Sequence, residues 1–190
     1  MFHISSLLKN SVLTATVCFA AASAMAQSTE KPTDSQIADI AYTAGQIDVT
    51  AANLALEKTK TRAVRSFAEE MVRDHEAVNK QVLALLDKLN VKPEDNDTSK
   101  SMVDAASQKQ AELLQLSGAA FDKAYAENEV AYHQNVNETL EKTLIPDAQN
   151  GQVKQLLETG LKLFQEHQKH AEASRARAEV GSDADSSEDK

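Results

Sequence analysis

The chain has very little of several residue types on which whole classes of protein depend. Its 190 residues include one cysteine, Cys18, no tryptophan, five glycines and three prolines. A single cysteine excludes a disulfide framework within the chain and a zinc site built from thiolates. The scarcity of aromatic residues and a formal charge of −9 argue against stacking platforms and basic faces, so no nucleic-acid partner is expected. No Gly-rich phosphate loop, Gly-x-Ser-x-Gly elbow or nucleophile–base pair occurs, and the sequence therefore indicates no enzyme of these classes.

An apolar run near the N-terminus predicts a secretory signal peptide over residues 1–26. Lys9 precedes an uncharged apolar stretch over residues 11–22, and the triplet Ala24-Met25-Ala26 is a small-x-small cleavage site. The stretch is too short to span a membrane, and no second run of about 18 apolar residues follows. Cleavage would remove Lys9 and leave 164 residues with a formal charge of −10. We therefore expect a periplasmic protein with no transmembrane segment in its mature part, and no acylation site supports association with the outer membrane.

What remains is rich in alanine, leucine, glutamine, glutamate and lysine, and it predicts an all-α protein. Apolar residues recur at three- and four-residue spacing, which is typical of amphipathic helices. Four long helices are expected over residues 34–58, 61–89, 121–144 and 152–178, with a short helix over residues 99–116. Residues 27–33 are expected to form a flexible arm and residues 180–190 an acidic, disordered tail, so the helical bundle is assigned to residues 34–179.

Loop lengths predict the order in which the helices pack. The links around residues 59–60 and 147–151 are short, which favours two antiparallel hairpins. The linker over residues 90–118 contains the short helix and is long enough to cross a bundle about 40 Å in length. Two hairpins joined by such a crossover form a ferritin-like four-helix bundle. A single kinked helix, continuous from the short helix into the third long helix, is the alternative.

Three histidines, His75, His133 and His167, lie on or beside the apolar seams of three different helices, close to each helix midpoint. The midpoints of equally long antiparallel helices share one layer, so three imidazoles are expected to meet in the core. Buried polar groups of this kind need a hydrogen-bond partner or a ligand. His170, one turn after His167, is expected on the solvated flank of its helix.

The ligand chemistry that this layer suggests is a three-histidine metal site with Asp48 or Glu129 as a supporting ligand. Neutral imidazoles suit a transition metal such as zinc, copper or iron. A ferritin-type di-iron site is not expected, because that design uses Glu-x-x-His pairs. The residues three before the histidines are Val72, Val130 and Phe164.

A structural interpretation competes with the metal site, and the sequence favours it. Each histidine would then be a core residue hydrogen-bonded to a tyrosine or a carboxylate on a neighbouring helix, which fixes the register of the bundle. The side chains available for this are Tyr125, Tyr132, Asp48 and Glu129. In the metal-site interpretation, Asp74, Glu129 and Glu166 are the expected orienting carboxylates, because each lies close in sequence to a histidine.

Three segments carry a resemblance to a known family. Residues 67–75 (Phe-Ala-Glu-Glu-Met-Val-Arg-Asp-His), residues 118–125 and residues 163–171 resemble the signature blocks of the family called domain of unknown function 4142. The similarity extends over residues 34–178. It implies a secreted, ferritin-like bundle of a kind commonly labelled an outer-membrane protein, and it implies no agreed activity. Asp48 departs from the pattern of the family, in which a glutamate precedes the valine, and this shorter carboxylate weakens the expectation of a ligand from the first helix.

Two functional hypotheses follow. The favoured one is an envelope interaction or stress-protection protein that binds an envelope partner and uses the histidine layer for structure. The alternative is a bundle that sequesters or senses a transition metal through that layer. The sequence indicates no oligomeric state.

Overall fold

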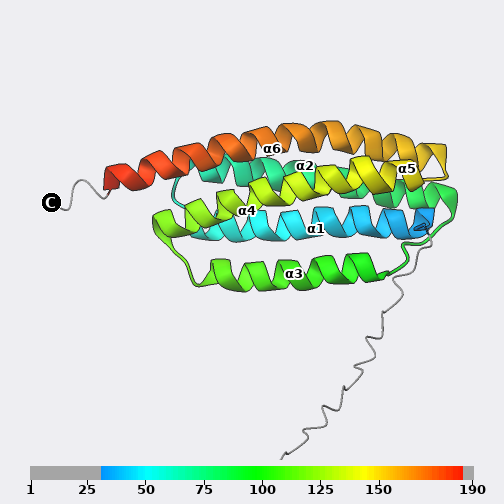
Figure 1. Ribbon diagram of the computed structural model, residues 1–190, viewed down its shortest axis with the longest axis horizontal. Helices are drawn as coiled ribbons and strands as arrows, with labels where there is room; N and C mark the ends of the chain where they lie inside the picture. The colour runs from blue at the N-terminus through cyan, green and yellow to red at the C-terminus, as the bar shows by residue number, and fades with distance from the viewer. Residues whose placement is uncertain (1–30, 186–190) are drawn as a thin grey trace, which may run out of the picture. The chain divides into compact units, whose positions relative to one another are not determined.

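Helices account for nearly all of the chain that the computed structural model describes, residues 31–185 (Figure 1). The elements in chain order are α1 (Asp34–Lys58), α2 (Arg62–Leu89), α3 (Asp97–Leu114), α4 (Gly118–Thr139), the π-helical turn η1 (Leu140–Leu144), α5 (Ile145–Asp147) and α6 (Gly151–Asp185). No strand occurs within residues 31–185. The predicted signal peptide, residues 27–30 of the predicted arm and residues 186–190 of the predicted tail lie outside the described residues.

Side-chain caps fix the starts of α1 and α3. Thr33 accepts a hydrogen bond from the backbone of Gln36, whose side chain in turn accepts from the backbone of Thr33, so α1 begins with a capping box. Asn96 and Ser99 form the same arrangement at the start of α3. Helix α2 ends at Asn90, which adopts the left-handed conformation with φ 53°. These local signals explain why α1 covers the predicted residues.

The crossover predicted from the loop lengths is confirmed. The backbone N–H of Glu94, just before α3, donates to Ser35 at the start of α1 (3.4 Å). Lys58, at the end of α1, donates to the carbonyl of Leu114 at the end of α3 (2.7 Å). Helix α3 therefore runs along the length of α1, and α3 and α4 are two separate helices rather than one kinked helix. The fold is an all-α bundle with ferritin-like topology.

The four long helices pack as two hairpins, α1 with α2 and α4 with α6. Helix α2 also packs on α6 and α1 on α4, while α3 lies outside the bundle against α1 and α4 (Figure 1). The apolar core is divided into two main clusters. One contains Met71, Phe121 and Tyr125, and the other contains Ile37 and Leu157. The predicted histidine layer falls between the two clusters.

Helix α6 buries the seam that the sequence predicts, from Val153 to Ser174 in alternating steps of four and three residues. Helix α4 is rotated relative to its predicted stripe. His133, expected on the flank, is fully buried, whereas Tyr132, expected on the stripe, is only partly buried. The rotation places His133 at the centre of the core.

The apolar residues of α2 predict a heptad seam with steps of four and three residues: Val64, Ala68, Met71, His75, Val78, Val82, Leu85 and Leu89. The buried face follows this seam as far as His75 and then moves away from it. Beyond that point Asn79 and Leu86 are buried, whereas Val78 and Leu85 are only partly buried. A straight α-helix drifts by about 20° per heptad relative to a strict seven-residue repeat. The heptad prediction therefore holds only in part over the second half of α2: Val82 is buried, and Val78 and Leu85 pack against the core from its edge, while the centre of the buried face has moved to Asn79 and Leu86.

Two helix ends also differ from prediction. The third long helix was expected to stop at Pro146, but its last turn widens into η1, where Ile145 N–H bonds to Leu140, and α5 then continues to Asp147. Helix α6 continues to Asp185, so the segment predicted as disordered from residue 180 begins as helix. Gly181 lowers helix propensity but does not stop the helix.

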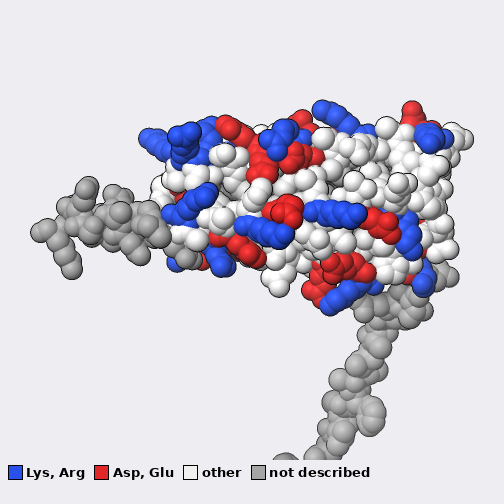
Figure 2. All heavy atoms as spheres, turned by 90° about the horizontal axis from the view of Figure 1, so that it is seen from above, with Lys and Arg blue, Asp and Glu red and all other residues white. Residues whose placement is uncertain are grey.

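The surface carries mixed charge. On the face that includes α6, basic and acidic side chains are interspersed over most of the surface (Figure 2). Among the described residues, no helix combines the length and the apolarity needed to cross a membrane.

Candidate metal centre

Three imidazoles meet in one layer of the core, as the positions of the histidines in the sequence predict. The ring centroids of His75 and His133 are 5.7 Å apart, those of His75 and His167 5.2 Å, and those of His133 and His167 5.5 Å. Each of the three residues is no more than 2 % exposed. The rings therefore form a nearly equilateral triangle that α2, α4 and α6 supply together.

Asp48 brings a carboxylate from α1 into the same layer. Its Oδ2 lies 3.3 Å from Nε2 of His75 and 3.4 Å from Nε2 of His133. Asp48 is 1 % exposed, so water does not shield it. Glu129, one turn before His133 on α4, adds a second buried carboxylate, with Oε2 3.8 Å from Nδ1 of His133.

Hydrogen bonds fix which ring nitrogens of two histidines carry a proton. Nδ1 of His133 lies 3.0 Å from the backbone oxygen of Glu129, which only accepts, so Nδ1 is the donor and Nε2 holds a lone pair. Nε2 of His167 lies 3.1 Å from a carboxylate oxygen of Asp74, which Arg73 also holds. His167 therefore donates through Nε2 and keeps a lone pair on its buried Nδ1. A carboxylate that holds the outer nitrogen of a histidine in this way is common around metal ligands.

Many polar atoms of the layer have no hydrogen-bond partner among the described protein residues. They are both carboxylate oxygens of Asp48, both ring nitrogens of His75, Nε2 of His133, Nδ1 of His167 and Oε2 of Glu129. Asp48 approaches two imidazoles closely, but the alignment is not that of hydrogen bonds. Buried polar atoms are nearly always paired, and leaving one unpaired costs about 1–3 kcal/mol.

Burial also shifts the two carboxylates towards their neutral form. It raises the pKa of Asp48 to about 8. Burial, with a smaller effect from the charge of Asp48, raises the pKa of Glu129 well above its ordinary value. Without a cation, Asp48 therefore holds a proton at neutral pH. A cation in the layer would displace that proton.

The histidines are shifted towards their neutral form as well. Burial, followed by the charges of the other two imidazoles, lowers the pKa of His75 well below 6.5. Burial lowers the pKa of His133 to about 4, and the hydrogen bond to Glu129 opposes this only in part. The pKa of His167 is also lowered, because burial outweighs its contact with Asp74. Neutral imidazole is the form that binds metal ions.

The partners of the histidines differ from those that the sequence suggested. Asp74 was expected to orient its neighbour His75, but it contacts His167 instead. Glu166 was expected to orient His167, but it is exposed and pairs with Lys169 (2.7 Å). Both predictions assumed that the carboxylate adjacent in sequence lies on the same helix face, whereas neighbouring helical residues point about 100° apart.

The two tyrosines expected as hydrogen-bond partners of the histidines, Tyr125 and Tyr132, do not bond to them. The hydroxyl of Tyr132 donates to the backbone oxygen of Ala44 on α1 (2.7 Å), and that of Tyr125 is buried without a partner among the described residues. His170 is on the flank as expected, with its side chain 53 % exposed, and it contacts Glu70 (3.0 Å).

Phe164 is a residue of this site that sequence analysis did not identify. Its ring stacks on His75, with centroids 4.7 Å apart and planes within 7° of parallel. The available signal was its position on the seam of α6, one turn before His167. Asn137 on α4 donates to the backbone oxygen of Phe164 (3.3 Å) and holds that turn in place.

The potential metal ligands of the layer come from all four long helices. One potential ligand comes from each long helix: Asp48 from α1, His75 from α2, His133 from α4 and His167 from α6. The three histidines offer nitrogens within 4.8 Å of one another, and Asp48, Glu129 and His133 form a second such group. Three imidazoles and a carboxylate fit a tetrahedral zinc site or a copper or iron site.

Comparisons with known proteins agree with the fold. No protein with a curated description matches the chain. The crystal structure of a Streptomyces coelicolor protein, described as a secreted protein of DUF305, superposes with a TM-score of 0.65 at 13% sequence identity, over 76% of this chain and 93% of that one. This likeness concerns the fold alone. A family described as "Domain of unknown function (DUF4142)" matches residues 19–173, most of the chain, and the protein therefore belongs to the DUF4142 family.

Proposed function

We propose that this protein is an exported bundle that binds a single transition-metal ion through His75, His133, His167 and Asp48, and sequesters or senses that metal. The observation that carries the proposal is the convergence of unpaired lone pairs in one buried layer, supplied by four different helices. The three imidazoles are neutral, the form that binds metal ions, and a cation would displace the proton of Asp48. Glu129 lies beside the site as a further oxygen donor.

The competing hypothesis gives the histidine layer a purely structural role in an envelope interaction or stress-protection protein. It expects each imidazole to be hydrogen-bonded to a tyrosine or a carboxylate, because a polar network fixes helix register only when its members are satisfied. His167 has such a partner, the carboxylate of Asp74 on α2, and Nδ1 of His133 bonds to a backbone oxygen, but among the described residues His75 has no hydrogen-bond partner. The side chains of Tyr125, Tyr132, Asp48 and Glu129 bond to none of the three histidines. This favours the metal site, although it was the second hypothesis from sequence alone.

The periplasm is part of this proposal. The predicted signal peptide, residues 1–26, supports export, and the description of the DUF305 protein as secreted agrees with it. Intact-mass measurement on protein recovered by osmotic shock, with an N-terminus at Gln27, would establish both cleavage and location. Recovery of the uncleaved chain from the cytoplasm would refute this part.

The metal site is tested by binding of zinc, copper(II) and iron(II) to tag-free mature protein, followed by calorimetry and by metal analysis after gel filtration. One equivalent of one of these metals should remain bound. His75→Gln should abolish stoichiometric binding, because it removes one ligand at little change in size. His170→Gln is the matched control, since His170 lies on α6 with its side chain exposed.

A bound metal should also raise the unfolding temperature, because it binds the folded state alone. Metal at a hundred times its dissociation constant adds about 2.7 kcal/mol of stability. If none of the three metals binds stoichiometrically and none changes the melting curve, the metal proposal is wrong and the structural hypothesis stands.

A further inference from the structure

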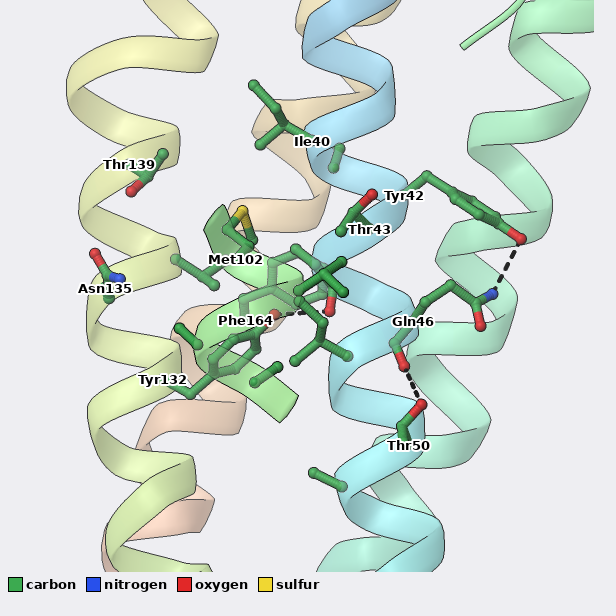
Figure 3. Close-up of a pocket in the computed structure, with 18 of the residues that line it drawn as sticks. Ile40, Tyr42, Thr43, Gln46, Thr50, Met102, Tyr132, Asn135, Thr139 and Phe164 are labelled. Atoms are coloured by element: carbon green, nitrogen blue, oxygen red, sulfur yellow. Dashed lines mark hydrogen bonds between the residues drawn. The ribbon is translucent and has the colours of Figure 1, made fainter. Parts of the chain in front are cut away.

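A second feature of the molecule, a long cavity beneath α3, is not used by the metal site. The cavity has a volume of about 660 Å³ and lies between α1, α3 and α4, where it enters the bundle core. Figure 3 shows Ile40 and Thr43 on α1 and Asn135 and Thr139 on α4, with Met102 of α3 and Phe164 of α6 between them. Protein interiors are normally close-packed, and cavities of about 300–1,000 Å³ are typical of small-molecule sites.

Helix α3 covers this cavity and is fixed to the bundle at both of its ends. It is fixed at its first turn, where Asn96 donates to the backbone oxygen of Gln36 (3.4 Å). It is fixed again at its last turn, where Leu113 is buried and Lys58 donates to the carbonyl of Leu114. The buried residues of α3 are Ser99 and Leu113, one near each end. Between these ends the inward-facing residues Met102, Ala106 and Gln110 are only partly buried, and they line the cavity.

The lining is almost free of charge. Among the described residues that line the cavity, Lys109 alone is charged, in a chain with 20 basic and 29 acidic residues. The lining includes no carboxylate, and its deep part consists of aliphatic and aromatic side chains such as Val78, Leu157 and Phe164. Lys109 lies near one end and pairs with Glu112 on the outer side of α3. This distribution suits an apolar molecule with an anionic or polar group at one end.

The cavity is long. Its lining extends along α1 from Ile40 to Leu54 and along α3 from Thr98 to Leu113, which is about 20 Å of helix in each case. A cavity of this length, lined mainly by apolar side chains, accepts an extended hydrocarbon chain.

From these observations we infer that the cavity beneath α3 binds a single-chain amphiphile, with its acyl chain between α1, α3 and α4 and its anionic head beside Lys109. Free fatty acids and lysophospholipids share this chemistry. Phe164 lines the inner side of the cavity, and its ring also stacks on the ring of His75. A bound acyl chain would therefore lie one aromatic ring away from the histidine layer. The inference does not depend on a metal ion.

Fluorescence of cis-parinaric acid, a linear fatty acid, provides the test on metal-free mature protein. We expect saturable binding at one equivalent and displacement by palmitate. Displacement by lysophosphatidylglycerol but not by palmitate would assign the ligand to the phospholipid source, and the reverse to free fatty acids. Both outcomes support an acyl-chain site. Absence of saturable binding of parinaric acid, with no displacement by either competitor, would overturn it.

Matched variants locate the site. Ala106→Phe fills the cavity from α3 and Thr43→Phe fills it from α1, and each should weaken parinaric acid binding roughly tenfold or more. Ala111→Phe introduces the same ring on the exposed side of α3, outside the lining, and should leave binding unchanged. Circular dichroism establishes that each variant is folded, and two filling variants on different helices protect the test against the misfolding of one. Equal binding by a folded filling variant and by Ala111→Phe would refute the location.

The head group is tested separately. Lys109→Glu should weaken binding of palmitate roughly threefold or more and leave binding of neutral hexadecanol unchanged, because only the charged head meets Lys109. An equal effect on both ligands would contradict the orientation.

Discussion

Replacing Asp48 by asparagine keeps the size of the side chain and removes its titration. In the metal-free protein, burial raises the pKa of Asp48 to about 8, from an ordinary value of 3.8. Between these two pH values the folded protein holds a proton that the unfolded chain has lost. Stability from this group is therefore complete below the lower pKa and is lost as the pH rises through about 8. Each pH unit in that window costs about 1.4 kcal/mol, so the whole window amounts to something on the order of 5 kcal/mol.

Asp48→Asn should have the opposite effect on the stability of the metal-loaded protein. The ionised carboxylate of Asp48 would then be a ligand, and the cation would remove the cost of burying its charge. Asp48→Asn should therefore stabilise the metal-free protein at pH 8.5 and lower its affinity for metal by a factor of about ten or more. One substitution with opposite effects on the two states is difficult to explain by packing alone.

Urea unfolding at pH 5.5, 7.0 and 8.5 measures both effects, with a chelator in one series and one equivalent of zinc in the other. Glu57→Gln is the control, because Glu57 is an exposed carboxylate on the same helix. In the chelator series, the stability of the wild type should fall relative to Asp48→Asn as the pH rises. If the two proteins keep a constant difference at all three pH values, Asp48 does not titrate in this range and the electrostatic argument for the site fails.

Three further predictions concern the stability of the metal-free protein, measured by urea unfolding. Because the folded-state pKa of His133 is about 4, the unfolded chain binds a proton below pH 6.5 that the folded state excludes, and the stability of the wild type should fall relative to His133→Gln by up to about 3 kcal/mol between pH 6.5 and 4; a constant difference between the two proteins would contradict neutral burial. A Cβ at Gly45 would lie 2.3 Å from Oδ1 of Asn79, so Gly45→Ala should cost about 1–3 kcal/mol, whereas Gly151→Ala, with open space around it, should not. Met71→Ala should cost about 2–5 kcal/mol, because Met71 is 0% exposed and its removal leaves a cavity; a cost below about 1 kcal/mol would show that the core collapses around it.

The helices and their order could be predicted because local signals determine them. The three- and four-residue spacing of apolar side chains marked every long helix, and the capping box at Thr33 accounts for the start of α1 at the predicted residue. Loop lengths then separated the two hairpins from the crossover. The sequence predicted less well how each helix is rotated about its own axis, as at Val78 and Leu85 of α2. A small angular drift per turn accumulates along a long helix and changes which residues face the core.

The histidine layer could be predicted because it depends only on height along the bundle. Its partners could not, since they depend on how each helix is rotated and on which neighbour it meets. The pairing of Asp74 with His167 joins α2 to α6, and no pattern within either helix encodes it. The cavity beneath α3 was also missed, because it arises from a gap in packing rather than from any motif.

That each of the four long helices contributes one of the proposed ligands has a mechanical consequence. The two hairpins are joined in sequence only through α3 and its loops, so an ion shared by Asp48, His75, His133 and His167 would act as a clasp between them. Binding of the metal would hold the two hairpins together at the middle of the bundle. Release of the metal would allow the hairpins to separate, with α3 as their connection. The rigidity of the bundle would then depend on whether the metal is bound.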